Sequence, residues 1–126
     1  MASNKVILIV DDEAPIRRVI EMKLKNGGYG VLLATNGEEA LRIIQNEKPD
    51  AVISDINMPH MDGKQLCELS DPLKQIRPFL TVIMTGRIMP DERVWIDKMH
   101  DTIFMEKPFS PSRLLESLDR YFGTQR

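Results

Sequence analysis

The chain has 126 residues, with 17 Lys and Arg against 19 Asp and Glu, a formal net charge of -2 and 42% apolar residues. This length suits one domain with a sizeable core, and it excludes an eight-unit βα barrel or a two-lobed kinase. The near-neutral charge gives no reason to expect nucleic acid or a membrane as a direct partner, because such partners call for a basic patch. The single cysteine, Cys67, closes no intramolecular disulfide, and the first apolar run is too short for a signal segment, so we expect a cytoplasmic protein.

Short apolar runs rich in β-branched residues alternate with longer stretches of helical period, which predicts repeated strand and helix units. Most of the short runs are apolar throughout, as expected for a parallel sheet that is covered on both faces. The predicted strands are residues 6–10, 29–34, 51–54, 79–84 and 102–105. Five such units predict an α/β fold with a doubly wound five-stranded parallel sheet, and the whole chain, 1–126, as one domain.

The first two helices are predicted after the first two strands. The first covers residues 14–25 and ends at Asn26-Gly27-Gly28. In the second, Thr35 and Glu38 fit a capping box, and Pro49 blocks continuation. The predicted inner face of the first helix consists of Ile16, Val19, Ile20 and Leu24.

The remaining three helices differ in how clearly the sequence bounds them. The third follows Gly63, and we expect a kink or a break at Asp71-Pro72, followed by a short restart. The fourth begins at Pro90, with Val94, Trp95 and Met99 on its predicted inner face. The fifth is bounded at both ends, because Ser110 can cap it, Pro111 suits its first position and Gly123 follows its last apolar residue.

Polar residues follow the predicted strands at the places where ligands bind in such folds, outside the carboxyl ends. They are Asp11-Asp12-Glu13 after the first strand, Asp55-Ile56-Asn57-Met58-Pro59 after the third, Thr85-Gly86 after the fourth and Glu106-Lys107-Pro108 after the fifth. If these strands are neighbours, three aspartates, a hydroxyl and an ammonium group meet in one shallow crevice.

This combination of groups predicts a magnesium site. Mg²⁺ prefers oxygen ligands from carboxylates and carbonyls, and we expect Mn²⁺ to substitute for it. Without a cation, carboxylates about 4 Å apart would repel by roughly 4 kcal/mol at an effective dielectric constant near 20. When the cation is bound, Lys107 and the Thr85 hydroxyl complete a site for the oxygens of a phosphoryl group, and an aspartate in the same crevice can act as nucleophile.

The sequence resembles the receiver domain of bacterial two-component response regulators, in particular the single-domain regulators of the chemotaxis type. The likeness covers nearly the whole chain. Five separated matches carry it: Asp11-Asp12, Asp55 within D-I-N-M-P-H-M-D-G, Thr85-Gly86, Phe104, and Lys107-Pro108. The resemblance implies a flavodoxin-like fold with strand order 2-1-3-4-5.

The resemblance also implies a role for each matched residue. Asp55 would accept a phosphoryl group; Asp12, Asp55 and the backbone carbonyl of Asn57 would bind Mg²⁺, and Asp11 would act mainly through water. Thr85 and Lys107 would hold phosphoryl oxygens. Phe104 would be the switch aromatic that turns inward when the Thr85 loop closes, and the Lys107-Pro108 peptide bond would be cis.

The implied partner is a sensor histidine kinase or a phosphotransfer protein, whose phosphohistidine supplies the phosphoryl group. The implied output is a changed surface formed by the fourth helix, the fifth strand and the fifth helix. That surface would contact a downstream protein or a fused effector domain absent from this chain, or form a phosphorylation-dependent homodimer. We expect no turnover of external substrates.

Some positions depart from the commonest choices in the family. Arg87 places a cation two residues after Thr85, and we hypothesise that Arg87, with Asn57, modulates phosphoryl lifetime or donor selectivity. The Asp71-Pro72 break makes the path of the third helix unusual. His60 and His100 fit no zinc pattern and receive no role, and Cys67 is interpreted as a buried or half-buried small residue.

Four other functions compete with this interpretation. An EF-hand fails because Pro59, His60 and Leu66 stand where an oxygen ligand, Gly and Glu are needed. A flavin-mononucleotide protein would be repelled by the acids after the first strand. A haloacid-dehalogenase-type phosphatase needs a D-x-D pattern that Asp11-Asp12-Glu13 lacks. A degenerate receiver that works without phosphorylation is disfavoured by the intact Asp, Thr and Lys set.

Overall fold

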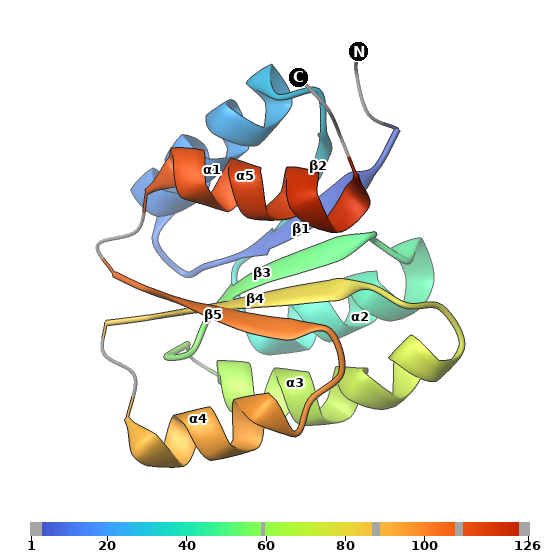
Figure 1. The fold of residues 1–126 in the computed structure, drawn as a ribbon, viewed down its shortest axis with the longest axis vertical. Helices are drawn as coiled ribbons and strands as arrows, with labels where there is room; N and C mark the ends of the chain where they lie inside the picture. The colour runs from blue at the N-terminus through green and yellow to red at the C-terminus, as the bar shows by residue number, and fades with distance from the viewer. Residues whose placement is uncertain (1–3, 59, 87–88, 108–109, 124–126) are drawn as a thin grey trace.

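The computed structural model describes residues 4–58, 60–86, 89–107 and 110–123. Its centre is one parallel five-stranded sheet in the order β2-β1-β3-β4-β5 (Figure 1). The strands are β1 (Val6–Val10), β2 (Gly30–Ala34), β3 (Ala51–Asp55), β4 (Leu80–Thr85) and β5 (Thr102–Glu106). The predicted strand positions and the strand order implied by the resemblance are confirmed, with boundaries within one residue.

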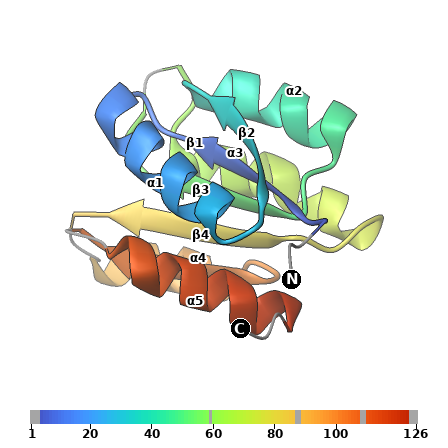
Figure 2. The same ribbon diagram turned by 90° about the horizontal axis from the view of Figure 1, so that it is seen from above.

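The helices cover both faces of the sheet. They are α1 (Ala14–Asn26), α2 (Gly37–Glu47), α3 (Gly63–Ser70), α4 (Pro90–Asp97) and α5 (Pro111–Phe122), and a 3₁₀ helix, η1 (Asp71–Gln75), continues from α3. Helices α1 and α5 lie on one face, and α2, α3 and α4 lie on the other (Figures 1 and 2). This arrangement confirms the doubly wound α/β fold.

The continuous apolar runs are explained by the two faces that each strand buries. Alternate residues of a strand point to opposite faces. Ile7 and Ile9 pack with α1 and α5, whereas Leu8 and Val10 pack with α2 and α3, and all four have no exposed surface. A sheet covered on both sides therefore needs no polar alternation.

Three details of the predicted helices are wrong. Asn36, not Thr35, caps α2, because its side chain accepts from the backbone N–H of Glu39. Val19 and Val94 were predicted to face inward, but they are 49% and 56% exposed. In α4, Ile96 is 2% exposed, and Trp95 and Met99 face inward as predicted and pack against the core.

The predicted interruption of the third helix is confirmed. Helix α3 ends at Ser70, and Pro72 lies in the first turn of η1, where its missing N–H removes no helical hydrogen bond. Among the described residues, no helix is long and apolar enough to cross a membrane.

Candidate functional site

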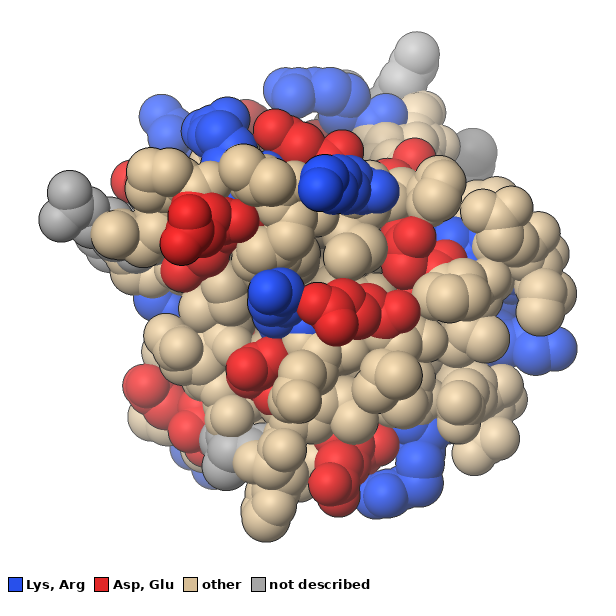
Figure 3. Space-filling model, turned by 90° about the horizontal axis from the view of Figure 1, so that it is seen from below, with Lys and Arg blue, Asp and Glu red and all other residues tan. Residues whose placement is uncertain are grey.

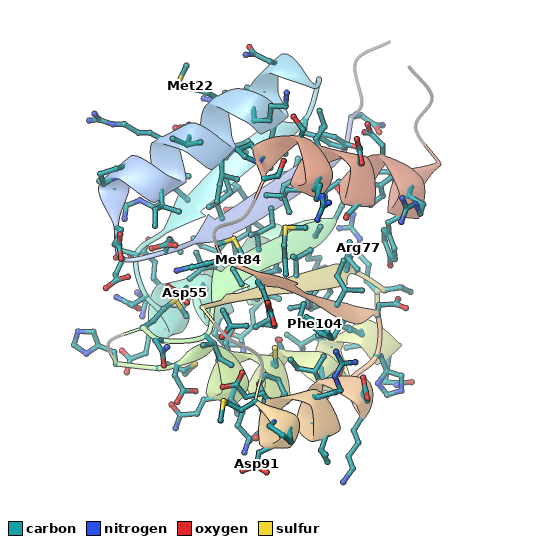
Figure 4. All side chains as sticks on the ribbon, turned by 60° about the vertical axis from the view of Figure 1, so that its left-hand side comes forward. Met22, Asp55, Arg77, Met84, Asp91 and Phe104 are labelled. Carbon is teal, nitrogen blue, oxygen red and sulfur yellow. The ribbon has the colours of Figure 1, made fainter. Side chains whose placement is uncertain are left out.

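Four strands deliver polar side chains to the carboxyl edge of the sheet. Asp11 follows β1, Asp55 and Thr85 are the last residues of β3 and β4, and Lys107 follows β5. Because β3 lies between β1 and β4, Asp55 is central among them. Figure 4 shows the labelled Asp55 at this edge. The sequence prediction that these side chains share one crevice is supported by their geometry.

The three aspartates form a tight acidic group. One carboxylate oxygen from each of Asp11, Asp12 and Asp55 lies within 4.8 Å of the others. Asp11 is fully buried and Asp55 is 6% exposed, whereas Asp12 is exposed. Three negative charges at this spacing, two of them shielded from water, repel one another strongly.

The surroundings of Asp11 show most directly that the negative charge of the acidic group is not fully balanced. Its Oδ1 accepts from the backbone N–H of Glu13 at 2.9 Å, but its Oδ2 is buried with no hydrogen-bond partner in the described part of the chain. Burial raises the pKa of Asp11, and the charges of Asp55 and Asp12 raise it further against opposing contributions from Glu13 and Lys107. A buried carboxylate oxygen without a donor is unusual, and it fits a site that receives a cation.

Lys107 opposes the acidic group from the other side. Its Nζ lies 2.8 Å from Asp55 Oδ2 in a half-buried ion pair. Burial alone would lower the pKa of Lys107, but the hydrogen bond and the charge of Asp55 outweigh it and raise that pKa. The backbone N–H of Lys107 donates to the Thr85 carbonyl at 2.6 Å, which fixes the lysine to the end of β4.

The chain after Asp55 turns back closely over it. The backbone N–H of Asn57 donates to Asp55 Oδ1 at 3.3 Å. The backbone N–H of Gly63 donates to the Ile56 carbonyl at 2.8 Å, and a Cβ on Gly63 would lie 2.6 Å from the Asp55 carbonyl oxygen. Glycine at position 63 is therefore required for α3 to begin directly against the strand end that carries Asp55.

Thr85 and Phe104 lie on adjacent strands beside this site. Thr85 is 2% exposed at the end of β4. Phe104 is half-buried, packs against the cluster of Ile56, Cys67 and Ile83, and is covered by the Arg93 guanidinium 4.6 Å from its ring centre. Phe104 therefore contacts both the interior and the surface formed by α4 and β5 (Figure 4).

The donor set of the acidic group fits a hard divalent cation such as Mg²⁺. All three side chains offer carboxylate oxygens, the ligand type that Mg²⁺ and Mn²⁺ prefer, and one of these oxygens is buried without a donor among the described residues. The nearby ammonium group of Lys107 adds a positive charge that an incoming anion can use.

Some predicted positions lie outside the described residues. These are Arg87, Pro59 and Pro108, so the Arg87 hypothesis and the predicted cis peptide at Lys107-Pro108 stay predictions. Two supporting contacts were not predicted. Arg17 Nη1 donates to the Asp11 carbonyl at 2.7 Å, and Asp62 and Gln65 form the capping box of α3. The D-x-x-Q spacing of Asp62 and Gln65 was visible in the sequence.

Comparisons with known proteins identify the same family. The chain is 36% identical over 108 residues to the alkaline phosphatase synthesis transcriptional regulatory protein PhoP of Bacillus subtilis, covering 86% of this chain and 44% of that protein. It is 38% identical over 110 residues to the response regulator MprA of a Mycobacterium strain, covering 86% and 46%. The chain thus spans less than half the length of these relatives.

Solved structures agree in fold and extent. The chemotaxis protein CheY4 of Vibrio cholerae matches with a TM-score of 0.84 and 31% identity, over 94% of this chain and 98% of that one. A CheY-like receiver domain protein from Methanospirillum hungatei matches with a TM-score of 0.85 and 31% identity, over 96% and 95%. The response regulator receiver domain model matches residues 7–119, and the chain belongs to this family of two-component signalling domains.

Proposed function

We propose that the chain is the phosphoacceptor of a two-component relay and that Asp55 receives the phosphoryl group from a phosphohistidine of a sensor kinase or phosphotransfer protein. One observation carries the proposal: Asp55 is held by the Lys107 ammonium at 2.8 Å while carboxylate oxygens of Asp11 and Asp12 lie within 4.8 Å of one of its own. A nucleophile between a fixed cation and a cation-binding group is what phosphoryl transfer requires.

In the proposed step, a carboxylate oxygen of Asp55 attacks phosphorus, and the phosphorus–nitrogen bond of the donor breaks as the imidazole leaves. Lys107 shifts from pairing Asp55 to pairing a phosphoryl oxygen, so its charge is retained at the site. The Thr85 hydroxyl binds a second oxygen from the adjacent strand end. Both groups act by stabilising the charge on the transferred phosphoryl group.

Asp12, Asp55 and the backbone carbonyl of Asn57 would hold Mg²⁺ directly, and Asp11 would act through water. When bound, Mg²⁺ or Mn²⁺ neutralises charge on the phosphoryl oxygens. The chain's own contribution is to bring the carboxylates together and to keep Asp11 buried, which makes the acidic group costly without a cation.

The proposed output is a protein contact on the surface of α4, β5 and α5. Phe104 lies half-buried on that surface, close to the strand end that carries Thr85, and we propose that it turns inward on phosphorylation. The recipient would be a separate protein, a fused effector domain or a second copy of the chain. Figure 3 shows the side of the molecule on which α3 and α4 lie, and acidic and basic side chains are interspersed there.

Acetyl phosphate tests the proposal without knowledge of the kinase. The chain is incubated with acetyl phosphate and Mg²⁺, and intact mass should show a single phosphoryl adduct. Asp55→Asn should abolish the adduct, and Asp91→Asn, at an exposed position of α4, should leave it unchanged. Lys107→Gln should reduce it.

Two outcomes would contradict the proposal. An adduct that persists in Asp55→Asn would place the acceptor elsewhere. Turnover of phosphate monoesters that survives Asp55→Asn would indicate a phosphatase instead of a phosphoacceptor.

A further inference from the structure

A pocket lies at the amino edge of the sheet, away from Asp11, Asp12 and Asp55. It has a volume of about 470 Å³ and is formed by the end of α2, the residues before β3, η1 and the residues before β4. A five-residue strand spans about 17 Å, so this pocket and Asp55 are well separated. Figure 4 places Arg77, one of the pocket residues, and Asp55 at opposite ends of the sheet.

The floor and walls of the pocket are apolar. Ile44 and Phe79 are 4% exposed and belong to the core, and Leu73 packs against the same core cluster. Ile76, at the mouth, is 83% exposed, more than any other large apolar side chain in the described part of the chain. An apolar ligand seated in the pocket would cover Ile76 and contact side chains that are already fixed, which favours binding.

The rim carries two cations, and no carboxylate is found among the described residues that line the pocket. Arg77 is held in place, because Nη1 donates to the Lys48 carbonyl at 2.7 Å and Nη2 pairs with Asp50 at 2.6 Å. These two bonds use two of its five N–H groups. The Lys48 side chain is exposed and has no ion-pair partner among the described residues.

Asp50 neutralises the charge of Arg77, so the net positive charge of the rim comes from Lys48. Its Oδ1 binds Arg77 and its Oδ2 accepts from the backbone N–H of Val6 at 2.8 Å, so both oxygens are already compensated. Lys48 therefore supplies an uncompensated positive charge beside an apolar pocket, with spare Arg77 donors next to it.

We propose that this pocket binds a small amphipathic carboxylate, with its hydrocarbon or aromatic body against Ile44, Leu73 and Phe79 and its carboxylate at Lys48 and Arg77. Volumes of about 300–1,000 Å³ are typical of small-molecule sites. A fixed guanidinium with spare donors is suited to a carboxylate. The proposal does not depend on phosphoryl transfer at Asp55.

Amide chemical shifts test the proposal. The ¹⁵N-labelled chain is titrated with octanoate, octan-1-ol and octylamine. Octanoate should produce saturable shifts at residues 44–48 and 73–77, with octan-1-ol at least about fivefold weaker and octylamine weaker still. Shortening octanoate to hexanoate should lower the affinity about two- to fourfold per methylene.

Matched variants test whether the charge of Lys48 contributes to octanoate binding. Lys48→Gln should weaken octanoate binding about three- to tenfold and leave octan-1-ol binding unchanged. Lys64→Gln, at the start of α3, should change neither. Asp55→Asn should bind octanoate as the unmodified chain does, so failure of the phosphoacceptor proposal would not affect this result.

Equal affinities for octanoate and octan-1-ol would overturn the assignment of a carboxylate. Shifts that do not saturate, or that map to α1 or α5, would overturn the site itself.

Discussion

The two ends of the sheet both bury charge, but they compensate it differently. At the amino end, Lys74 is 6% exposed and donates to the carbonyls of His100 and Asp101 and, at 3.1 Å, to the Thr102 hydroxyl. At the carboxyl end, Asp11 retains a buried oxygen that has no donor in the part of the chain that the structure describes, beside two further carboxylates. The buried charge of Lys74 is satisfied by groups within the fold. The acidic group at the carboxyl end instead fits a cation bound from solution.

The pKa values follow the same division. Burial lowers the pKa of Lys74, and Asp71 only partly offsets that effect, so the ammonium depends on its acceptors. Burial raises the pKa of Asp11, and the neighbouring aspartates add to the rise. Buried charge with satisfied partners adds rigidity, and buried like charges cost stability that a bound cation can return.

The largest expected effect on stability comes from removing the hydrogen bonds of Lys74. Lys74→Met removes the donor to two carbonyls and a hydroxyl between η1 and the turn before β5. We expect the free energy of unfolding to fall by about 2–4 kcal/mol in urea titrations. Lys64→Met, at an exposed position of α3, should cost less than about 0.5 kcal/mol. Equal losses in both variants would mean that the Lys74 contacts contribute nothing.

Binding of Mg²⁺ at the carboxyl end should change the stability slightly less. Mg²⁺ at 100 times its dissociation constant should stabilise the chain by about 2.7 kcal/mol, measured as a rise in melting temperature. Sodium chloride at matched ionic strength should not reproduce it, and Asp55→Asn should lose most of it. The same rise with sodium chloride would identify general screening in place of a cation site.

Removing one charge from the acidic group should sharpen the contrast further. Without divalent cations, Asp12→Asn should raise the free energy of unfolding by about 1 kcal/mol, because repulsion among the aspartates is relieved after screening by water. Glu116→Gln, at an exposed position of α5, should change it by less than about 0.5 kcal/mol. A loss of stability in Asp12→Asn would show that the carboxylates do not oppose folding.

The smallest effect concerns the exposed side of the amino-end network. Asp71 accepts from the His100 backbone N–H at 2.9 Å and pairs with its ring at 2.8 Å. Burial alone would raise the pKa of Asp71, but these His100 interactions outweigh it and lower that pKa below 3.8. Asp71→Asn should cost about 0.5–1 kcal/mol at pH 7.

The pH dependence of this last variant has a defined sign. A carboxyl whose folded pKa is lowered contributes stability above its unfolded pKa, and loses it as the pH falls through the folded value. The difference between Asp71→Asn and the unmodified chain should therefore shrink as the pH falls below 3.8. Urea midpoints on either side of pH 3.8 measure it, and a difference that grows as the pH falls below that value would contradict the assignment.

The sequence predicted the carboxyl end far better than the amino end. Asp11, Asp55, Thr85 and Lys107 each follow or end an apolar strand, and parallel strands bring such positions together without detailed packing. Lys74 gave no comparable signal, because two of its three partners are backbone carbonyls 26 and 27 residues away, and any residue type carries a carbonyl. The predicted burial of Val19 and Val94 was wrong because the rotation of a helix about its axis depends on the layers packed against it.

The contact between Gly63 and the Asp55 carbonyl sets a rule for protein engineering. The end of β3 lies so close to the start of α3 that position 63 has room for a hydrogen atom but not for a Cβ. The strand end and the following helix start are therefore not interchangeable parts. A chimaera that grafts the Asp55 loop onto another receiver must transfer residues 55–63 as one cassette, or rebuild the junction between strand and helix.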